Sequence, residues 1–522
     1  MTESSRRQHA GATAVGSGIL LSRVTGLLRD VTFAAFLGTG LLADAYWAAL
    51  RIPNIIRNLL GEGTLSASFV PVYSDLLANP EKSATSPTRL AQSVLAAVLS
   101  VALLLSGVGV VAAPWLTRIV APGFDTAATD LTISLVRILF PMAGVFIVGG
   151  WCLGILNSHR RFFLPYVAPV AWNLSQIAGL LLAWRLGAES LVHVLAWSAL
   201  AGALLQLAVQ LPATRRLTGT LRPRWRDSPP ETSRVIRNAL PVVSSQGIYQ
   251  VSSLVEVTVA SIVGLGAVSA LGYSQRLIYL PISLFGASIA IAALPEMSRE
   301  TRIEAVRARI VNGFFQILFF VLPAAVVFIL FGDLIVRVLL QRRAFGEEST
   351  AIVSTVLLVY ALGLVASSSN KLFASGFHAL RDTSTPMRVA LVAVSTGMVV
   401  GVVSALAMKA AGYGAMSAAG IAAGGVFGAW LNLMLLWRRL GRRLGGLLNP
   451  ATRRALAKLT AGCLAAAAAA WPVRMWLEAA VGVAGTLPAL AVLTAALSAG
   501  AIPYLLIVRR PPRPAPMPGD SA

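Results

Sequence analysis

The sequence predicts an all-α polytopic membrane protein with about fourteen transmembrane helices. Of its 522 residues, 56% are hydrophobic and only 12% are charged, about half the roughly 25% charged residues of soluble domains. The apolar residues form long runs, most of them near the roughly 20 residues that a helix needs to cross a bilayer. These two observations exclude an ordinary soluble enzyme and a disordered chain.

The candidate spans follow one another along almost the whole chain. Several exceed about 25 residues and contain proline or glycine, so we expect tilted or broken helices there. Their approximate ranges are 12–37, 41–78, 91–113, 131–157, 163–184, 190–211, 235–263, 267–297, 311–339, 350–378, 386–408, 414–437, 456–476 and 484–508. An even number of spans puts both ends of the chain on one side.

The net charge of +22 is mainly a topology signal. If the N-terminus is cytoplasmic, the inner segments hold 29 of the 43 lysines and arginines and the outer segments hold six. Positive charge gathers in this way on the cytoplasmic side of membrane proteins. We therefore expect both termini in the cytoplasm, and no nucleic acid as a partner.

An internal repeat organises the chain. Glycines and prolines after the first span reappear after the seventh, at offsets of 224 to 228, and the pattern Gly154, Arg160, Pro165 reappears at offsets of 221 and 222. The offset spans six helices, which predicts two lobes of one topology, as in many transporters. The expected divisions are an N-lobe at 1–211, a basic linker at 212–233, a C-lobe at 234–440, two further spans at 441–510 and a disordered tail at 511–522.

The first span contains charges that need an explanation at membrane depth. Arg23 lies about 16 Å into a helix that begins at residue 12, and a charge at mid-bilayer costs roughly 2.5–3.5 kcal/mol on insertion scales. Arg23 and Asp30 share one face, while Arg29 points away from it. Gly26, near that face, would let a ligand or a backbone approach.

The second span is also charged. Asp44 and Arg51 are seven residues apart, and Pro53 and the glycines around Glu62 are expected to break the helix on either side of Arg57. Irregular backbone at membrane depth lines cavities. Structural ion pairs, Arg23 with Asp30 and Asp44 with Arg51, are the alternative interpretation.

Arginine is in surplus among these groups, and its planar guanidinium binds phosphate oxygens well. Four arginines, Arg23, Arg29, Arg57 and Arg276, outnumber the acids near them, which favours a polyanionic ligand. Glu256, a lone acid in the seventh span, could carry a proton, bind a cation or serve structure. No phosphate-binding loop, nucleophile–base pair or metal-ligand spacing is present, so we expect neither an enzyme nor a bound cofactor or metal.

Several runs resemble the MurJ (MviN) family of lipid II flippases, within the multidrug/oligosaccharidyl-lipid/polysaccharide exporter group. The resemblance covers about residues 12–440. The matching runs include SRVTGLLRD at 22–30, ADA at 43–45, RIPNIIR at 51–57, GEG at 61–63, SFVP at 68–71, APGF at 121–124, GILN at 154–157 and LP at 294–295.

The resemblance implies a flippase that moves undecaprenyl-diphosphate-linked peptidoglycan precursor across the bacterial plasma membrane by alternating access. It implies that Arg23, Arg29, Asp44, Arg57 and Arg276 bind this substrate, with Gly26, Asp30 and Glu62 in support. Some members place an aspartate near the position of Glu256 in a sodium site. It also implies that the extra helices, including residues 463–470, border a groove for the lipid tail.

Other readings remain open. A flippase for another polyprenyl-diphosphate-linked glycan would use the same anionic handle, and a multidrug/cation antiporter would share the fold. Coupling to sodium, protons or membrane potential is equally compatible with the sequence. Membrane lipids and cell-wall synthesis proteins are the further partners we expect.

Overall fold

The computed structural model describes residues 3–79, 81, 85–187, 190–300, 302–447, 449–483 and 485–508. The side chains of residues 3–16, 62, 245, 248 and 249 are outside this description, as is the tail expected at 511–522. The described chain is mostly helical and contains no strand. It forms two compact units, Met1–Ile262 and Val263–Ala522.

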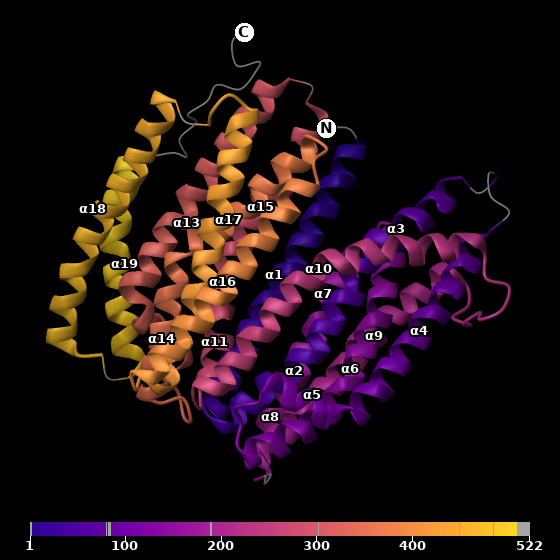
Figure 1. Cartoon of the computed structure of the whole chain (residues 1–522), viewed down its shortest axis with the longest axis horizontal. Helices are drawn as coiled ribbons and strands as arrows, with labels where there is room; N and C mark the ends of the chain where they lie inside the picture. Colours follow the sequence, from indigo (N-terminus) through magenta and orange to yellow (C-terminus); the bar gives the residue numbers. More distant parts are fainter. Residues whose placement is uncertain are drawn as a thin grey trace. The chain divides into compact units, whose positions relative to one another are not determined.

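The first unit is a bundle centred on one long helix. Its helices are α1 (Glu3–Leu37), α2 (Leu41–Leu60), α3 (Glu62–Ala78), α4 (Pro87–Val111), α5 (Ala113–Val120), α6 (Thr126–Ser158), α7 (Phe163–Val167), α8 (Pro169–Arg185), α9 (Leu191–Thr218) and α10 (Pro230–Val263). Helix α6 packs against α2, α3, α4 and α9 (Figure 1). Phe69, Tyr73 and Trp151 are buried in the core between them.

The second unit repeats this plan and adds two helices. Its elements are α11 (Ala267–Pro281), the π-helix η1 (Ile282–Ala287), α12 (Ser288–Arg299), α13 (Ile303–Leu340), α14 (Glu347–Leu362), α15 (Leu364–Ala379), α16 (Ser384–Ala410), the 3-10 helix η2 (Gly414–Ser417), α17 (Ala418–Arg443), α18 (Pro450–Val481) and α19 (Thr486–Val508). A capping box between Asn449 and Thr452 starts α18.

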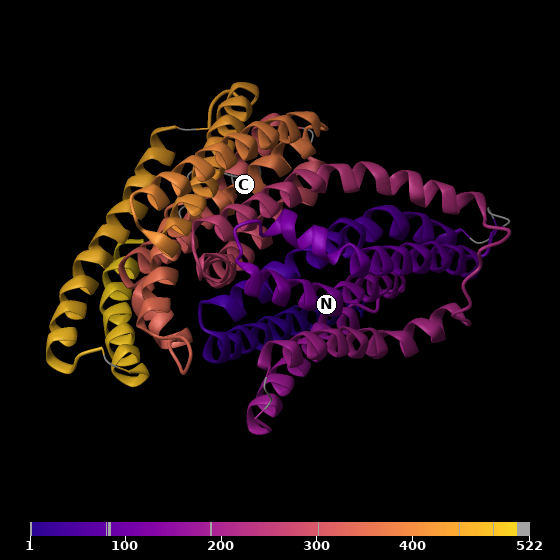
Figure 2. The same cartoon turned by 60° about the horizontal axis from the view of Figure 1, so that its bottom comes forward.

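Helices α18 and α19 run side by side against α13 (Figures 1 and 2). Phe331 of α13 and Val492 and Ala496 of α19 share an apolar cluster. The guanidinium of Arg474 on α18 also binds both carboxylate oxygens of Asp333 on α13, at 3.0 and 2.7 Å. The added pair is thus fixed to its unit by apolar packing and by one ion pair.

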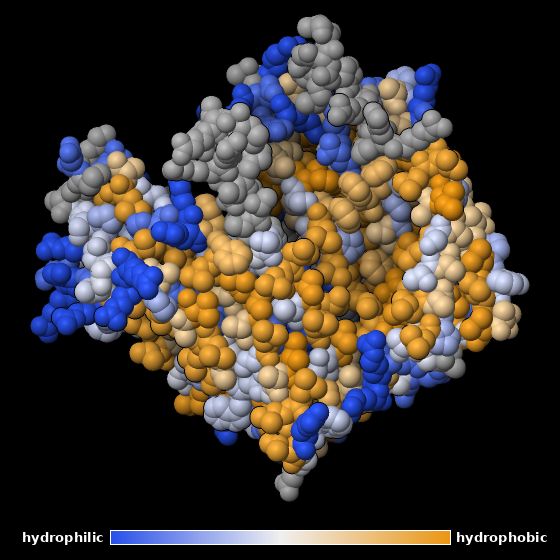
Figure 3. All heavy atoms as spheres, turned by 180° about the vertical axis from the view of Figure 1, so that it is seen from behind, coloured by the Kyte–Doolittle hydropathy of each residue, from blue (hydrophilic) through white to orange (hydrophobic). Residues whose placement is uncertain are grey.

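Ten helices of the described chain are long and apolar enough to cross a membrane, and an eleventh span results if α14 and α15, bent by 43°, count as one. Hydrophobic side chains accordingly cover wide parts of the surface (Figure 3). The other three expected spans, 12–37, 41–78 and 235–263, are helical, the second of them divided at Gly61, but they are not among these candidates within the described residues. The two-unit helical fold is confirmed, and the count of fourteen stays a prediction.

The internal repeat is visible in the order and packing of the helices. Helix α6 contacts α2 and α3 in the first unit, as α14 and α15 contact α11 and α12 in the second; α8 packs on α9, as α16 packs on α17. The expected lobe boundaries remain predictions. The segment 219–229 between α9 and α10 is non-helical and packs on α4, where the indole of Trp225 donates to Ser100 Oγ at 2.9 Å.

Of the two breaks predicted in the second expected span, the one at the glycines around Glu62 is confirmed and the one at Pro53 is wrong. Pro53 lies inside a continuous α2, because a proline costs a helix one hydrogen bond that neighbouring helices can compensate in a membrane protein. The break is at Gly61, whose N–H donates to the Arg57 carbonyl at 2.8 Å. A Cβ at Gly61 would lie 2.4 Å from that oxygen, so only glycine fits. Arg57 therefore belongs to the last regular turn of α2.

Candidate functional site

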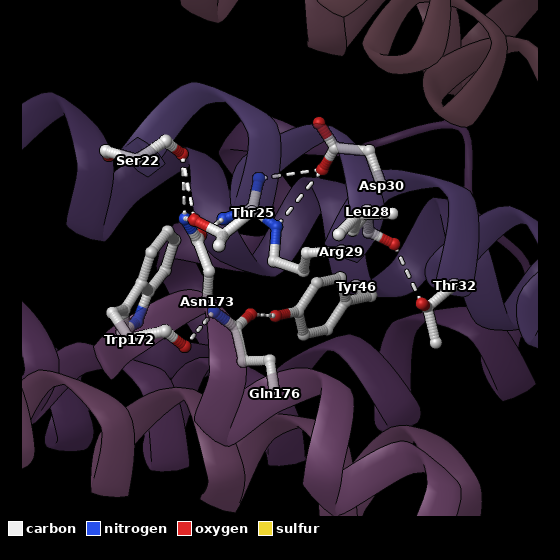
Figure 4. A network of polar contacts seen from close by, with 10 residues as sticks. All are labelled: Ser22, Thr25, Leu28, Arg29, Asp30, Thr32, Tyr46, Trp172, Asn173 and Gln176. Carbon is white, nitrogen blue, oxygen red and sulfur yellow. Dashed lines mark hydrogen bonds and ion pairs between the residues drawn. The ribbon is translucent and has the colours of Figure 1, made fainter. Parts of the chain in front are cut away.

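A buried polar network surrounds Arg29 in the first unit (Figure 4). The Arg29 side chain is only 4% exposed. It donates to Asp30 Oδ1 at 2.7 and 3.1 Å and to Asn173 Oδ1 of α8 at 3.0 Å. The indole of Trp172 lies against it, with the ring centroid 4.7 Å from Cζ. Arg29 is thus held by an acid, an amide and an aromatic ring in this structure.

The same network continues along α1 and α2. The amide of Asn173 donates to the Ser22 carbonyl at 3.2 Å and to Thr25 Oγ1 at 3.1 Å. One turn further along α8, Gln176 accepts from the hydroxyl of Tyr46 at 3.0 Å (Figure 4). Helix α8 therefore presents two amides to α1 and α2, which an apolar span can bury only because their hydrogen bonds are made.

The sequence did not identify Asn173 as a partner of Arg29, or Gln176 as a partner of Tyr46. Two amides three residues apart in an otherwise apolar span were the available signal. The predicted pairing of Asp30 with Arg23 is not seen, since Asp30 binds Arg29. Gly26 faces this network: a Cβ there would lie 3.6 Å from Asn173 Nδ2, an ordinary contact that would not require glycine.

Arg23 lies on another face of α1 and is exposed. Six residues along a helix turn the chain by about 240°, which separates its direction from that of Arg29. Among the described residues it forms no ion pair or hydrogen bond through its side chain. Arg23 is therefore available to a ligand from outside the chain.

The charges of α2 have contrasting environments. Asp44 is fully buried in the first turn, where the helix dipole stabilises a carboxylate. Arg51 is 25% exposed and turns to α10, where it donates to the Ser253 carbonyl at 2.9 Å and lies 3.5 Å from Glu256 Oε2. The structure thus pairs Arg51 with Glu256, not with Asp44 as one interpretation expected.

Arg57 ends α2 and is partly exposed, with Cζ 5.0 Å from the ring centroid of Phe146 on α6. Arg276 of the second unit is exposed on α11, five residues before Pro281. Glu62 begins α3, but its side chain lies outside the described residues. The predicted site residues therefore divide into a buried set, Arg29, Asp30 and Asp44, and an accessible set, Arg23, Arg57 and Arg276; whether they share one cavity stays a prediction.

No group of three or more metal-ligating side chains occurs among the residues that the structure describes. The first unit instead offers a cation at the surface of α1 and another at the end of α2. Guanidinium groups can bind an anion through paired hydrogen bonds. The geometry is suited to binding.

Comparison with known proteins gives a consistent result. The family model described as "Lipid II flippase MurJ" matches residues 33–492. A probable lipid II flippase MurJ of Rhizobium tropici is 35% identical over 438 residues, covering 82% of this chain and 80% of its own. The lipid II flippase MurJ of Burkholderia cenocepacia is 32% identical over 383 residues, covering 71% and 73%.

Solved structures show the same fold. A lipid II flippase MurJ in an inward closed conformation superposes with a TM-score of 0.78 over 95% of this chain and 98% of its own, at 21% identity. An inward-facing multidrug resistance MATE family transporter gives a TM-score of 0.60 over 81% and 98%, at 17% identity. The matched residues and the helices that can span a bilayer lead to one conclusion: the chain is a multi-pass membrane protein that belongs to the lipid II flippase MurJ family.

Proposed function

We propose that the chain translocates lipid II, the undecaprenyl-diphosphate-linked peptidoglycan precursor, from the inner to the outer leaflet of the bacterial plasma membrane. The observation that carries the proposal is the accessible set of arginines, Arg23, Arg57 and Arg276, on helices of a membrane-spanning fold. A diphosphate is an anion that planar guanidinium groups bind through paired hydrogen bonds. The identity of the substrate is inferred from the relatives that are named as lipid II flippases.

The proposed mechanism is alternating access. The head group enters from the cytoplasmic leaflet, and the accessible arginines bind its diphosphate while the polyprenyl tail stays in lipid. The two units then rearrange so that the head group faces the other side, and it is released there. No bond of the substrate is made or broken, so the chain acts as a transporter without a catalytic residue.

We assign a structural role to the buried set. Arg29 and Asp30 hold α1 against α8, and a buried, fully bonded ion pair is costly to break. Asp44 stabilises the start of α2. In this proposal these three residues support the substrate-binding helices, while direct contact with the diphosphate falls to the accessible set.

The energy source is proposed to act through α10. Glu256 faces Arg51 at 3.5 Å, so a proton or sodium ion on Glu256 would release Arg51 from its ion pair. Membrane potential is the alternative, at about 2.3 kcal/mol per charge per 100 mV. Transport by purified protein in vesicles, measured with a sodium gradient, a proton gradient or a potential imposed one at a time, distinguishes the three.

The test of the function is depletion of the protein in the bacterium that encodes it. We expect peptidoglycan synthesis to stop while lipid II accumulates in the inner leaflet. In a separate labelling experiment on undepleted cells, we expect both termini of the protein to be accessible from the cytoplasm. Normal wall synthesis with loss of another surface glycan would assign a different polyprenyl-diphosphate substrate. Normal walls with increased sensitivity to cationic drugs would instead favour the antiporter function that the MATE-like fold allows.

A further inference from the structure

A basic pocket lies where α6 ends and the chain turns into α7, in the first unit. It has a volume of about 440 Å³. Three arginines line it, Arg160 and Arg161 from the turn and Arg216 from the last turn of α9. The other lining residues are apolar: Leu156, Phe162, Phe163, Leu164, Ala213 and Leu217.

The turn that presents two of these arginines is rigidly built. The N–H of Arg160 donates to the Asn157 carbonyl at 3.0 Å, and that of Arg161 to the Leu156 carbonyl at 2.8 Å. These are the two hydrogen bonds of a Schellman motif. The motif requires a left-handed residue, and Arg160 takes this position with φ of 58°, where glycine is usual. The backbone of the turn thus places both arginines at the edge of the pocket.

The second unit contains the same turn with a different charge. Arg381, also with φ of 58°, donates to the His378 carbonyl, and Asp382 donates to the Phe377 carbonyl, each at an offset of 221 from its counterpart. Asp382 thus stands where the first unit has Arg161. Its carboxylate accepts from the N–H and hydroxyl of Thr385, at 2.9 and 2.7 Å, and binds Arg443 at 2.7 Å.

Arg443 in turn corresponds to Arg216. Both lie in the last turn of the equivalent helices α9 and α17, at an offset of 227. In the second unit the arginine is neutralised by the carboxylate of Asp382. In the first unit that carboxylate is replaced by another arginine, and no acidic residue lines the pocket. The protein supplies a carboxylate for the arginine of the second unit, whereas no residue lining the pocket supplies one in the first.

The walls of the pocket indicate what kind of anion this is. Phe163 is 47% exposed, and Phe162 and the leucines place apolar surface beside the guanidinium groups. The pocket also lies at the ends of α6 and α9, two helices able to cross the membrane, where aromatic and basic side chains meet lipid head groups. An amphiphilic anion fits this combination better than an inorganic one.

We propose that this pocket binds the phosphate of an anionic membrane phospholipid, with Arg160, Arg161 and Arg216 as its ligands. The phenylalanines cover the glycerol and the first methylenes of the acyl chains. The proposal is independent of the substrate-binding arginines, because none of them lines the pocket.

The experiment measures binding of phosphatidylglycerol to the purified full-length protein by native mass spectrometry, with phosphatidylcholine as the neutral reference. Arg161→Asp gives the first unit the charge pattern of the second, and we expect at least a tenfold weaker binding of phosphatidylglycerol. Arg215→Asp is the matched control, since Arg215 is an exposed neighbour on α9 outside the pocket. It makes the same charge change and should leave binding within about twofold.

Ala213→Trp tests the pocket without changing charge, because the indole would occupy its volume; we expect the same loss of binding. Equal weakening by Arg161→Asp and Arg215→Asp would overturn the proposal, since general surface charge would then explain the binding. The proposal would also be overturned, in favour of a free-anion site, if millimolar inorganic phosphate displaced phosphatidylglycerol and the Ala213→Trp variant still bound phosphatidylglycerol as the wild type does. Thermal unfolding of each variant verifies that it is folded.

Discussion

At the residue scale, two arginines six positions apart on α1 have opposite surroundings. Arg29 is buried among Asp30, Asn173 and Trp172, whereas Arg23 is exposed. The sequence predicted that both lie at membrane depth and on different faces. It could not predict which one the protein neutralises, because that depends on which face α8 packs against.

Asn173 joins α1 to α8, so Asn173→Ala should destabilise the protein. The substitution removes an acceptor from Arg29 and a donor from Ser22 and Thr25, leaving buried polar groups that cost about 1–3 kcal/mol each when unsatisfied. We expect a lower Tm in detergent. Asn58→Ala, at an exposed position with one 3.5 Å contact, is the control and should leave Tm nearly unchanged. An equal Tm for both variants would contradict the anchoring role.

His159, just beyond the end of α6, should make stability depend on pH. Burial and then the nearby charge of Arg161 lower the pKa of the imidazole below its ordinary value, so folding favours the neutral form. Its contribution to stability is complete above the ordinary pKa of about 6.5 and is lost as the pH falls through the lowered value. We expect Tm of the wild type to fall on acidification below about pH 6.5, and His159→Gln to reduce that dependence. An unchanged pH profile in the variant would show that other groups cause it.

At the scale of elements, local backbone geometry determines where a helix breaks, which hydropathy alone does not show. The long apolar runs predicted the positions of the helices, including those at 12–37, 41–78 and 235–263, which are not among the candidate spans of the described chain. Pro53 was wrongly expected to interrupt α2, because a proline signal does not reveal whether neighbours compensate the missing hydrogen bond. The break expected at the glycines around Glu62 is confirmed at Gly61, where a Cβ would lie 2.4 Å from the Arg57 carbonyl oxygen.

The same substitution, arginine to glycine, is expected to raise stability in a Schellman turn and to lower it within a helix. Arg381 has φ of 58°, a conformation that costs a non-glycine residue roughly 1–2 kcal/mol, so Arg381→Gly should raise stability by up to about 1 kcal/mol. Arg388→Gly, at an exposed position within α16, should lower it by about 1 kcal/mol. Chemical unfolding of the two variants provides the comparison, and a destabilised Arg381→Gly would show that its side chain matters more than its backbone.

At the scale of the whole molecule, the repeat explains both the fold and its asymmetries. Offsets of 221 to 228 in the sequence correspond to equivalent helices and to the same turn in both units, so the two-lobe plan could be predicted. The candidate site could be predicted only as a set of charges. Their division into a buried and an accessible group depends on long-range packing, as with Arg29 and Asn173, 144 residues apart.

The central claim is that the accessible arginines bind the diphosphate of lipid II. Its most direct test is the exposure of lipid II at the outer leaflet in cells that depend on Arg57→Ala, Arg276→Ala or the control Arg185→Ala, which removes an exposed arginine at the end of α8. Protein amounts are matched, and Arg57→Lys preserves the charge without the planar fork. We predict that Arg57→Ala and Arg276→Ala lose most of the exposure, that Arg57→Lys keeps part of it and that Arg185→Ala behaves as wild type. Undiminished lipid II exposure with Arg57→Ala and Arg276→Ala would contradict the account.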